Sequence, residues 1–236
     1  MERTRILLLG DLHGNMTATL AMEREMERLA LDEVWFLGDA VGKGPQNAET
    51  CDWAREHCQY FVGGNWDYGI AGDWQAPFYQ QQLGEERMKW LRDLPLELEL
   101  QVSGICFRVF HGRPVTPQFQ GFAGEEDLTP YFQADDKIYG GLISADTHRP
   151  YVRVLQAGYL INTGSVGNSH GVPKAHALLI EGVKGSLSPA PISFTVISVP
   201  YDNEAEVAAA RRYPDLPRQE AYISEIRTGV YSRWGM

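Results

Sequence analysis

The stretch RILLLGDLHGN, residues 5–15, decides the fold of this 236-residue chain. Four consecutive apolar residues, Ile6 to Leu9, are typical of a strand that is buried on both faces. Polar side chains and glycines follow at once, and Asn15 can cap the helix that comes next. The stretch therefore predicts a strand, a polar loop at its carboxyl end, and a helix.

The same order recurs through the first part of the chain. Strands are expected at 34–37 and 59–62, with a helix at 46–58 between them. Strands that alternate with helices over short links favour βαβ units and a parallel sheet. Beyond them we expect loops at 69–83 and 113–132, a helix at 85–94, hairpins at 96–110 and 151–162, strands at 137–143, 175–180 and 192–199, and a closing helix at 203–212. No repeat or linker divides the chain, so residues 1–236 are predicted to form one α/β domain.

Composition narrows the classes of function. Asp plus Glu number 31 against 21 Lys plus Arg, and a net charge of −10 disfavours a nucleic-acid scaffold. A small phosphorylated substrate remains compatible, because local cations can outweigh the overall field. Cys51, Cys58 and Cys106 are too few and odd in number for a disulfide framework, which favours the cytosol. We expect neither a signal peptide nor a membrane span, because the apolar runs are short.

Asp, Asn or His residues follow five of the predicted strands, most of them beside glycine. They are Asp11 and His13, Asp39, Asn65, His111, and Asp146 and His148. Ligands in open α/β sheets bind outside the carboxyl ends of the strands, so these side chains are expected to converge. Oxygen and imidazole ligands without thiolate suit Mn²⁺, Fe or Zn²⁺. Seven candidate ligands are too many for one tetrahedral ion and suit two ions that share a carboxylate.

Each of these features has a structural alternative when it is taken alone. A Gly-Asp pair after a strand is also common in turns and helix caps, and a lone histidine is often a core or surface residue. The coincidence of such residues at several strand ends favours a shared site.

The order and spacing of these blocks resemble the calcineurin-like metallophosphoesterase family. The matching blocks are GDLHGN (10–15), GDAVGKGP (38–45), GNWD (64–67), VFHGRP (109–114), SADTHRP (144–150) and NTGSVGN (162–168). The chain is most similar to a small bacterial subgroup with phosphodiesterases, diadenosine-polyphosphate hydrolases and protein-phosphatase-like members. The resemblance implies a four-layer α/β/β/α sandwich of two mixed sheets. It also implies a hydrolase of small phosphoesters or phosphoanhydrides, nucleotides included.

The resemblance further implies two divalent ions and a hydroxide between them as the nucleophile. One ion would be held by Asp11, His13, Asp39 and His148, and the other by Asp39, Asn65, His111 and Asp146. Asp39 would bridge the ions, and Asp67 would orient the ligands from behind. Lys43, Arg113 and Arg149 lie near ligand blocks and are candidate phosphate contacts, with solvated surface charge as the alternative.

Two positions depart from the family pattern. Asp146 stands where the family has histidine, so it adds negative charge beside the second ion. This charge favours Mn²⁺ or Fe over Zn²⁺. The alternative is that the second ion is held weakly or not at all. Trp66 stands where the family has a histidine that resembles a general acid, and an indole can only donate its N–H. The chain would then act on good leaving groups, use His170 or a bound water as the proton source, or serve as a metal- or nucleotide-binding module with little turnover. An enzyme that uses Asp11 as a nucleophile to form phosphoaspartate is disfavoured. Such enzymes usually have a second acidic residue two positions later, and here that residue is His13.

Aromatic residues are frequent in the two long predicted loops. They are Trp74, Phe78, Tyr79, Phe119, Phe122, Tyr131 and Phe132, and Trp66 precedes them. Such rings could stack on a nucleobase or could form a small core beneath the loops. The substrate, the metals and the oligomeric state stay open at this point, a homo-oligomer included.

Overall fold

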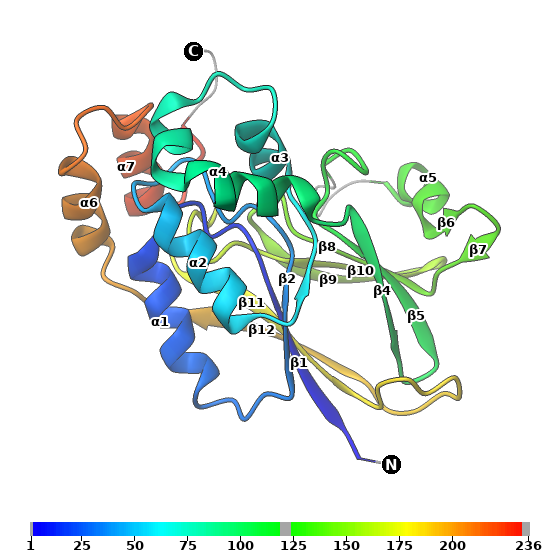
Figure 1. Cartoon of the computed structure of the whole chain (residues 1–236). Coiled ribbons are helices and arrows are strands. Elements are labelled where there is room, and N and C mark those ends of the chain that lie inside the picture. Colours follow the sequence, from blue (N-terminus) through cyan, green and yellow to red (C-terminus); the bar gives the residue numbers. More distant parts are fainter. Residues whose placement is uncertain (1, 119–123, 233–236) are drawn as a thin grey trace.

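The computed structural model describes residues 2–118 and 124–232, so the predicted loop aromatics Phe119 and Phe122 lie outside it. Two five-stranded mixed sheets are stacked on one another, as Figure 1 shows. The first, in the order β12-β11-β1-β2-β3, consists of β1 (Thr4–Leu9), β2 (Glu33–Phe36), β3 (Tyr60–Phe61), β11 (Ala175–Gly182) and β12 (Ser193–Val199). The second, in the order β4-β5-β8-β10-β9, consists of β4 (Glu97–Val102), β5 (Ile105–Phe110), β8 (Gly141–Ser144), β9 (Pro150–Leu155) and β10 (Gly158–Thr163).

The helices lie mainly on the outer side of the first sheet (Figure 1). They are α1 (Met16–Met26), α2 (Asn47–His57), α3 (Asn65–Ala71), α4 (Pro77–Asp93), α6 (Asn203–Arg211) and α7 (Gln219–Thr228). The outer side of the second sheet carries a thinner layer, made of α5 (Glu125–Leu128) and a 3-10 turn (Thr129–Phe132). A short hairpin of β6 (Gln133–Ala134) and β7 (Lys137–Ile138) adjoins it. The predicted α/β/β/α order is therefore confirmed, with one outer layer much shorter than the other.

Strand β1 explains why the layers stack in this way. Ile6 and Leu8 belong to the core between the two sheets, whereas Leu7 and Leu9 belong to the core beneath the helices. Successive side chains of a strand point to opposite faces, so a continuous apolar run serves both cores. The strand buried on both faces that the opening stretch predicts is confirmed.

The direction of the strands places the polar loops together. β1, β2 and β3 are parallel, and so are β5 and β8 in the second sheet. The strand β1 is also hydrogen-bonded to the antiparallel β11, which makes the first sheet mixed. All of the predicted ligands follow the carboxyl ends of β1, β2, β3, β5 and β8.

Several expectations about the elements were wrong, among them the loop at 113–132, which contains α5 and the 3-10 turn. Residues 69–83 are not a loop, because α3 extends to Ala71 and α4 begins at Pro77, whose fixed φ suits the first turn of a helix. Gly84 interrupts α4 with a φ of 66°, close to the predicted helix start. The strand expected at 137–143 is divided between β7 and β8. The helix α7 was not predicted.

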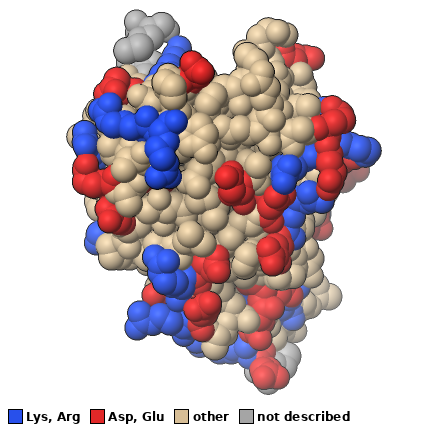
Figure 2. Space-filling model, turned by 60° about the vertical axis from the view of Figure 1, so that its left-hand side comes forward, with Lys and Arg blue, Asp and Glu red and all other residues tan. Residues whose placement is uncertain are grey.

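The surface mixes charges of both signs. On the face seen in Figure 2, basic and acidic side chains are interspersed around a wide area of other residues. Within residues 2–118 and 124–232, no helix combines the length and the apolar character needed to cross a membrane.

Candidate metal centre

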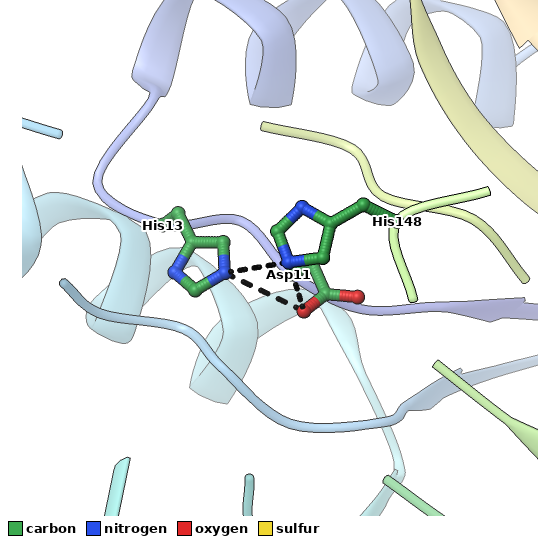
Figure 3. Close-up of side chains that lie close together, drawn as sticks. All are labelled: Asp11, His13 and His148. Atoms are coloured by element: carbon green, nitrogen blue, oxygen red, sulfur yellow. Dashed lines mark hydrogen bonds and ion pairs between the residues drawn. The ribbon is translucent and has the colours of Figure 1, made fainter. Parts of the chain in front are cut away.

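Side chains from four strand ends meet in one buried cluster. Oδ1 of Asp11 lies 3.5 Å from Nε2 of His13 and 3.3 Å from Nε2 of His148. The two imidazole nitrogens are 3.3 Å apart, and Figure 3 shows all three groups turned toward one point. His111 approaches from the second sheet, with its Nε2 3.9 Å from the same Asp11 oxygen. Residues that are up to 137 positions apart in sequence therefore share one site, as the strand-end pattern predicts.

Asp39 lies between the two halves of this cluster. Its Oδ2 is 3.6 Å from Nε2 of His13 and 3.3 Å from Nε2 of His111. Its Oδ1 accepts a hydrogen bond of 2.9 Å from the backbone N–H of Trp66. One carboxylate oxygen is thus fixed by the start of α3, while the other faces the imidazoles. This position is compatible with the bridging role predicted for Asp39.

Backbone carbonyls fix the orientation of the three histidines. Nδ1 of His13 donates to Val41 O (3.0 Å), Nδ1 of His111 donates to Leu37 O (2.6 Å), and Nδ1 of His148 donates to the carbonyl of Asn168. A carbonyl can only accept, so in each neutral ring the proton is on Nδ1, and Nε2 is the ring atom that carries the lone pair. Metal-binding histidines are held in this way.

The backbone of the site adopts a conformation that L-residues rarely take. Asp11, His13, Asp39, Asp146 and His148 all have φ between 47° and 64°. Left-handed conformations of non-glycine residues cost free energy and cluster at functional sites. The surrounding hydrogen bonds, such as Asp11 N to Gly38 O (2.8 Å), hold these loops in place.

Asp67 supports the loop that carries Asp39. Its carboxylate accepts the backbone N–H groups of Asp39 (2.7 Å), Ala40 (2.9 Å) and Gly64 (3.0 Å). Burial, followed by the charge of Asp39, raises the pKa of Asp67 to about 7. Position 64 must be glycine, because a Cβ there would lie 2.1 Å from Oδ1 of Asp39. Asp67 is therefore a positioning residue behind the cluster.

The atoms of the cluster fit a divalent cation. Among the described residues, Asp11 Oδ1, Asn65 Oδ1 and His111 Nε2 are buried and make no hydrogen bond. Buried polar atoms are normally satisfied, so unpartnered atoms on Asp11 and His111 in one cluster, and on Asn65 at the cavity that Asp39 also lines, indicate a site for a ligand. Two overlapping groups have the spacing of a metal site: Asp11, His13 and His148, and Asp11, Asp39 and His111.

A comparison with known proteins decides the family. Residues 4–184 match the family model described as the calcineurin-like phosphoesterase superfamily domain. The chain belongs to this superfamily. A curated relative, the uncharacterized protein MJ0912 of Methanocaldococcus jannaschii, is 26% identical over 202 residues, which are 74% of this chain and 82% of that protein.

Solved structures share the fold of this phosphoesterase. A metallophosphoesterase from Sphaerobacter thermophilus superposes with a TM-score of 0.75 at 24% identity, over 96% of this chain and 99% of that one. The hypothetical protein PH1004 from Pyrococcus horikoshii OT3 has a TM-score of 0.71 at 22% identity, over 97% and 100% of the two chains. The calcineurin-like fold predicted from the motif blocks is confirmed.

Asp146 is paired with Arg113. Nε of Arg113 lies 2.9 Å from Oδ2 of Asp146, Nη2 contacts Oδ1, and the Arg113 N–H donates to Oδ2 (3.2 Å). Although burial opposes it, the pKa of Asp146 is lowered by the Arg113 hydrogen bonds and by His111. The added negative charge is thereby neutralised within the protein. Nε2 of His111 is 3.9 Å from Oδ1 of Asp146, so the predicted ligand lies at the edge of the cluster.

The predicted substrate contacts all line one cavity over the metal ligands. It has a volume of about 700 Å³ and is lined by Asp39, Asn65, Asp146 and His148, by Lys43, Arg113 and Arg149, and by Trp66 and His170. Lys43 is buried, with Nζ 3.0 Å from Nε2 of His148 and 3.1 Å from Oδ1 of Asn168. The ring of His170, the predicted alternative proton source, stacks 4.6 Å from that of His148.

Burial and neighbouring charges shift the pKa values of the candidate ligands. Burial, opposed in part by His111, raises the pKa of Asp11 to about 8. Burial would lower the pKa of His111, but the carboxylates of Asp39, Asp11 and Asp146 outweigh it and raise that pKa well above its usual value. Burial and the Lys43 charge lower the pKa of His148. A divalent cation among the carboxylates would favour their ionised forms.

Asn168 and Tyr231 are among the residues of this site that were not predicted from the sequence. Asn168 orients His148 through its carbonyl and accepts from Lys43 through its side chain. Asn168 lies in the block NTGSVGN, which indicated the family but not the contacts of Asn168 with His148 and Lys43. Tyr231, which follows α7 in the sequence, also lines the cavity, and no local sequence pattern indicates this position.

Proposed function

We propose that this phosphoesterase is a dinuclear, divalent-metal-dependent hydrolase of small phosphoesters or phosphoanhydrides. The observation that carries the proposal is the set of three buried imidazoles, each oriented by a backbone carbonyl, around the carboxylates of Asp11 and Asp39. The family to which the chain belongs supports the same reaction class.

The residues divide between two proposed ions. Asp11, His13 and His148 would hold one, and Asn65 and His111 the other. Asp39 would be shared, because its Oδ2 lies near Nε2 of both His13 and His111. Oxygen and imidazole donors without thiolate favour Mn²⁺ or Fe, and Zn²⁺ also fits them. When bound, such ions lower the pKa of water and neutralise charge on the phosphoryl oxygens.

The protein groups supply position and charge around the phosphate. Lys43 and Arg149 line the cavity and would bind phosphoryl oxygens. Arg113 reaches the same cavity but is held by Asp146, so we assign it mainly to neutralising that carboxylate. Asp67 keeps the Asp39 loop in the conformation that the ligands need.

The cytosol is the proposed compartment. Cys51 and Cys58 are buried as free thiols, and Cys106 is also free. Free cysteines in this number are typical of proteins from reducing compartments.

The test measures phosphate or p-nitrophenol release from p-nitrophenyl phosphate and bis-p-nitrophenyl phosphate, with Mn²⁺ and after chelation. The two substrates separate phosphomonoesterase from phosphodiesterase activity. We expect Mn²⁺-dependent turnover that Asp39→Asn abolishes, because the shared ligand loses its charge. Asp136→Asn, an exposed acid in the β6–β7 hairpin, is the matched control and should keep full activity. Equal activity in Asp39→Asn and the unmodified protein would refute the role of the cluster.

A further inference from the structure

A second cavity adjoins the one above the metal ligands. Its volume is about 860 Å³, within the range of about 300–1,000 Å³ that small-molecule sites occupy. One wall is the beginning of α4, and the other is the segment 212–218 between α6 and α7. Trp66 and Tyr231 line both cavities, so a single ligand could occupy the two together.

A series of aromatic rings connects the metal ligands with this outer cavity. The Trp66 ring centroid is 5.8 Å from that of His13 and 6.3 Å from that of Tyr79. The Phe78 ring lies 5.2 Å from Tyr79 and 6.1 Å from Tyr213 across the cavity wall. Each pair meets edge to face, with interplanar angles from 81° to 89°. The aromatic wall therefore begins one ring away from a candidate metal ligand.

Polar groups at the outer cavity complement a nitrogen heterocycle. Gln75 and Gln81 are exposed and line the cavity, and an amide offers both donors and acceptors. Arg212, Arg218 and Asp215 also line the cavity, so charges of both signs are present. Aromatic faces with a few adaptable polar groups are typical of sites that bind a neutral planar ligand.

The far wall belongs to the C-terminal part of the chain. Residues 212–218 and Tyr231 lie beyond residue 184, where the match to the family model ends. The metal ligands all lie within the matched part. The near wall, which includes Trp66 and the beginning of α4, lies within the matched part as well.

We propose that the outer cavity binds the nucleobase of a nucleotide substrate while its phosphate lies at the metal ligands. A nucleotide matches both cavities, because its anionic phosphate is joined through a sugar to a neutral planar base. Trp66 forms the common wall between the two parts of the ligand. This inference rests on the proposed phosphoesterase function for the phosphate end only.

The first experiment compares AMP with ribose 5-phosphate, which has the same sugar and phosphate but lacks the base. We expect a higher kcat/KM for AMP. Phe78→Leu and Tyr213→Leu keep apolar volume but remove the ring faces. Each should raise the KM for AMP by about 5–100-fold, in line with loss of one stacking contact, and leave the KM for ribose 5-phosphate unchanged. Tyr60→Leu, a ring that stacks on Trp35 at the edge of the first sheet, is the matched control.

The second experiment does not depend on catalysis. Adenosine, which carries no phosphate, is titrated into metal-stripped protein and followed by calorimetry. Adenosine binding that Phe78→Leu weakens and Tyr60→Leu leaves unchanged would support the nucleobase site. If the protein then hydrolyses neither AMP nor ribose 5-phosphate, only the proposed hydrolase function is refuted. Equal kcat/KM for the two substrates without adenosine binding would overturn the nucleobase site and leave the hydrolase intact. Adenosine binding that neither cavity variant changes would also overturn it.

Discussion

Glu206 offers a test of the structure away from the metal ligands. It lies on α6 and is fully buried, and its carboxylate accepts the hydroxyls of Thr17 (2.7 Å) and Tyr222 (2.8 Å). Burial raises the pKa of Glu206 from its usual 4.5 to about 7, although these hydrogen bonds oppose the change. Glu206→Gln keeps the size of the side chain and can keep both contacts, because an amide both accepts and donates.

The sign of the effect follows from proton linkage. Between pH 4.5 and about 7 the folded chain holds a proton on Glu206 that the unfolded chain has released. The free energy of unfolding therefore falls as the pH rises through this window, and the loss is complete above it. At about 1.4 kcal/mol per pH unit, the loss is at most about 3 kcal/mol. Because an amide does not ionise in this range, the Glu206→Gln variant escapes this loss.

Urea and thermal unfolding in the presence of a chelator measure the difference. At about pH 8.5 we expect Glu206→Gln to be more stable than the unmodified protein by up to about 3 kcal/mol, or about 6–12 °C in Tm. At about pH 5 the two should be closely similar. Glu204→Gln is the control: this exposed carboxylate pairs with Arg227 (2.6 Å), so its loss should not stabilise the protein at high pH. A stability difference for Glu206→Gln that is the same at both pH values would refute the reasoning.

Two further predictions concern metal binding. Asp67→Asn leaves one acceptor for three backbone N–H groups and should weaken Mn²⁺ binding by about 10–100-fold in calorimetry; unchanged affinity would exclude its positioning role. Lys43→Met removes an ammonium 3.0 Å from Nε2 of His148 and should strengthen Mn²⁺ binding by about tenfold, because like charges repel strongly in a buried site. The same variant should raise the KM for phosphoesters, and weaker Mn²⁺ binding would contradict the proposed repulsion between the Lys43 ammonium and the ion.

Much of the site could be predicted because its signals are local. The apolar run before Asp11 and the Gly-Asp pair at 38–39 show where strands end and where polar side chains begin. Parallel strands then bring such ends to one edge of a sheet, so Asp11, Asp39 and His111 were predicted to converge and do so. The error at 69–83 has a local cause too: aromatic residues and glycine obscured the helix that Pro77 begins.

The sequence by itself determined the ligand-bearing loops and a parallel sheet, because periodicity and strand-end residues are local features. The order of its motifs also indicated the family, and the stacked sheets followed from that resemblance. Only the tertiary structure decided which groups complete the site. Arg113 neutralises Asp146 from 33 positions away, and Lys43 contacts His148 from 105 positions away. The outer cavity likewise forms between α4 and the segment that follows α6. Such contacts depend on how side chains that are distant in sequence pack against one another. No local or periodic sequence pattern indicates which of them will meet.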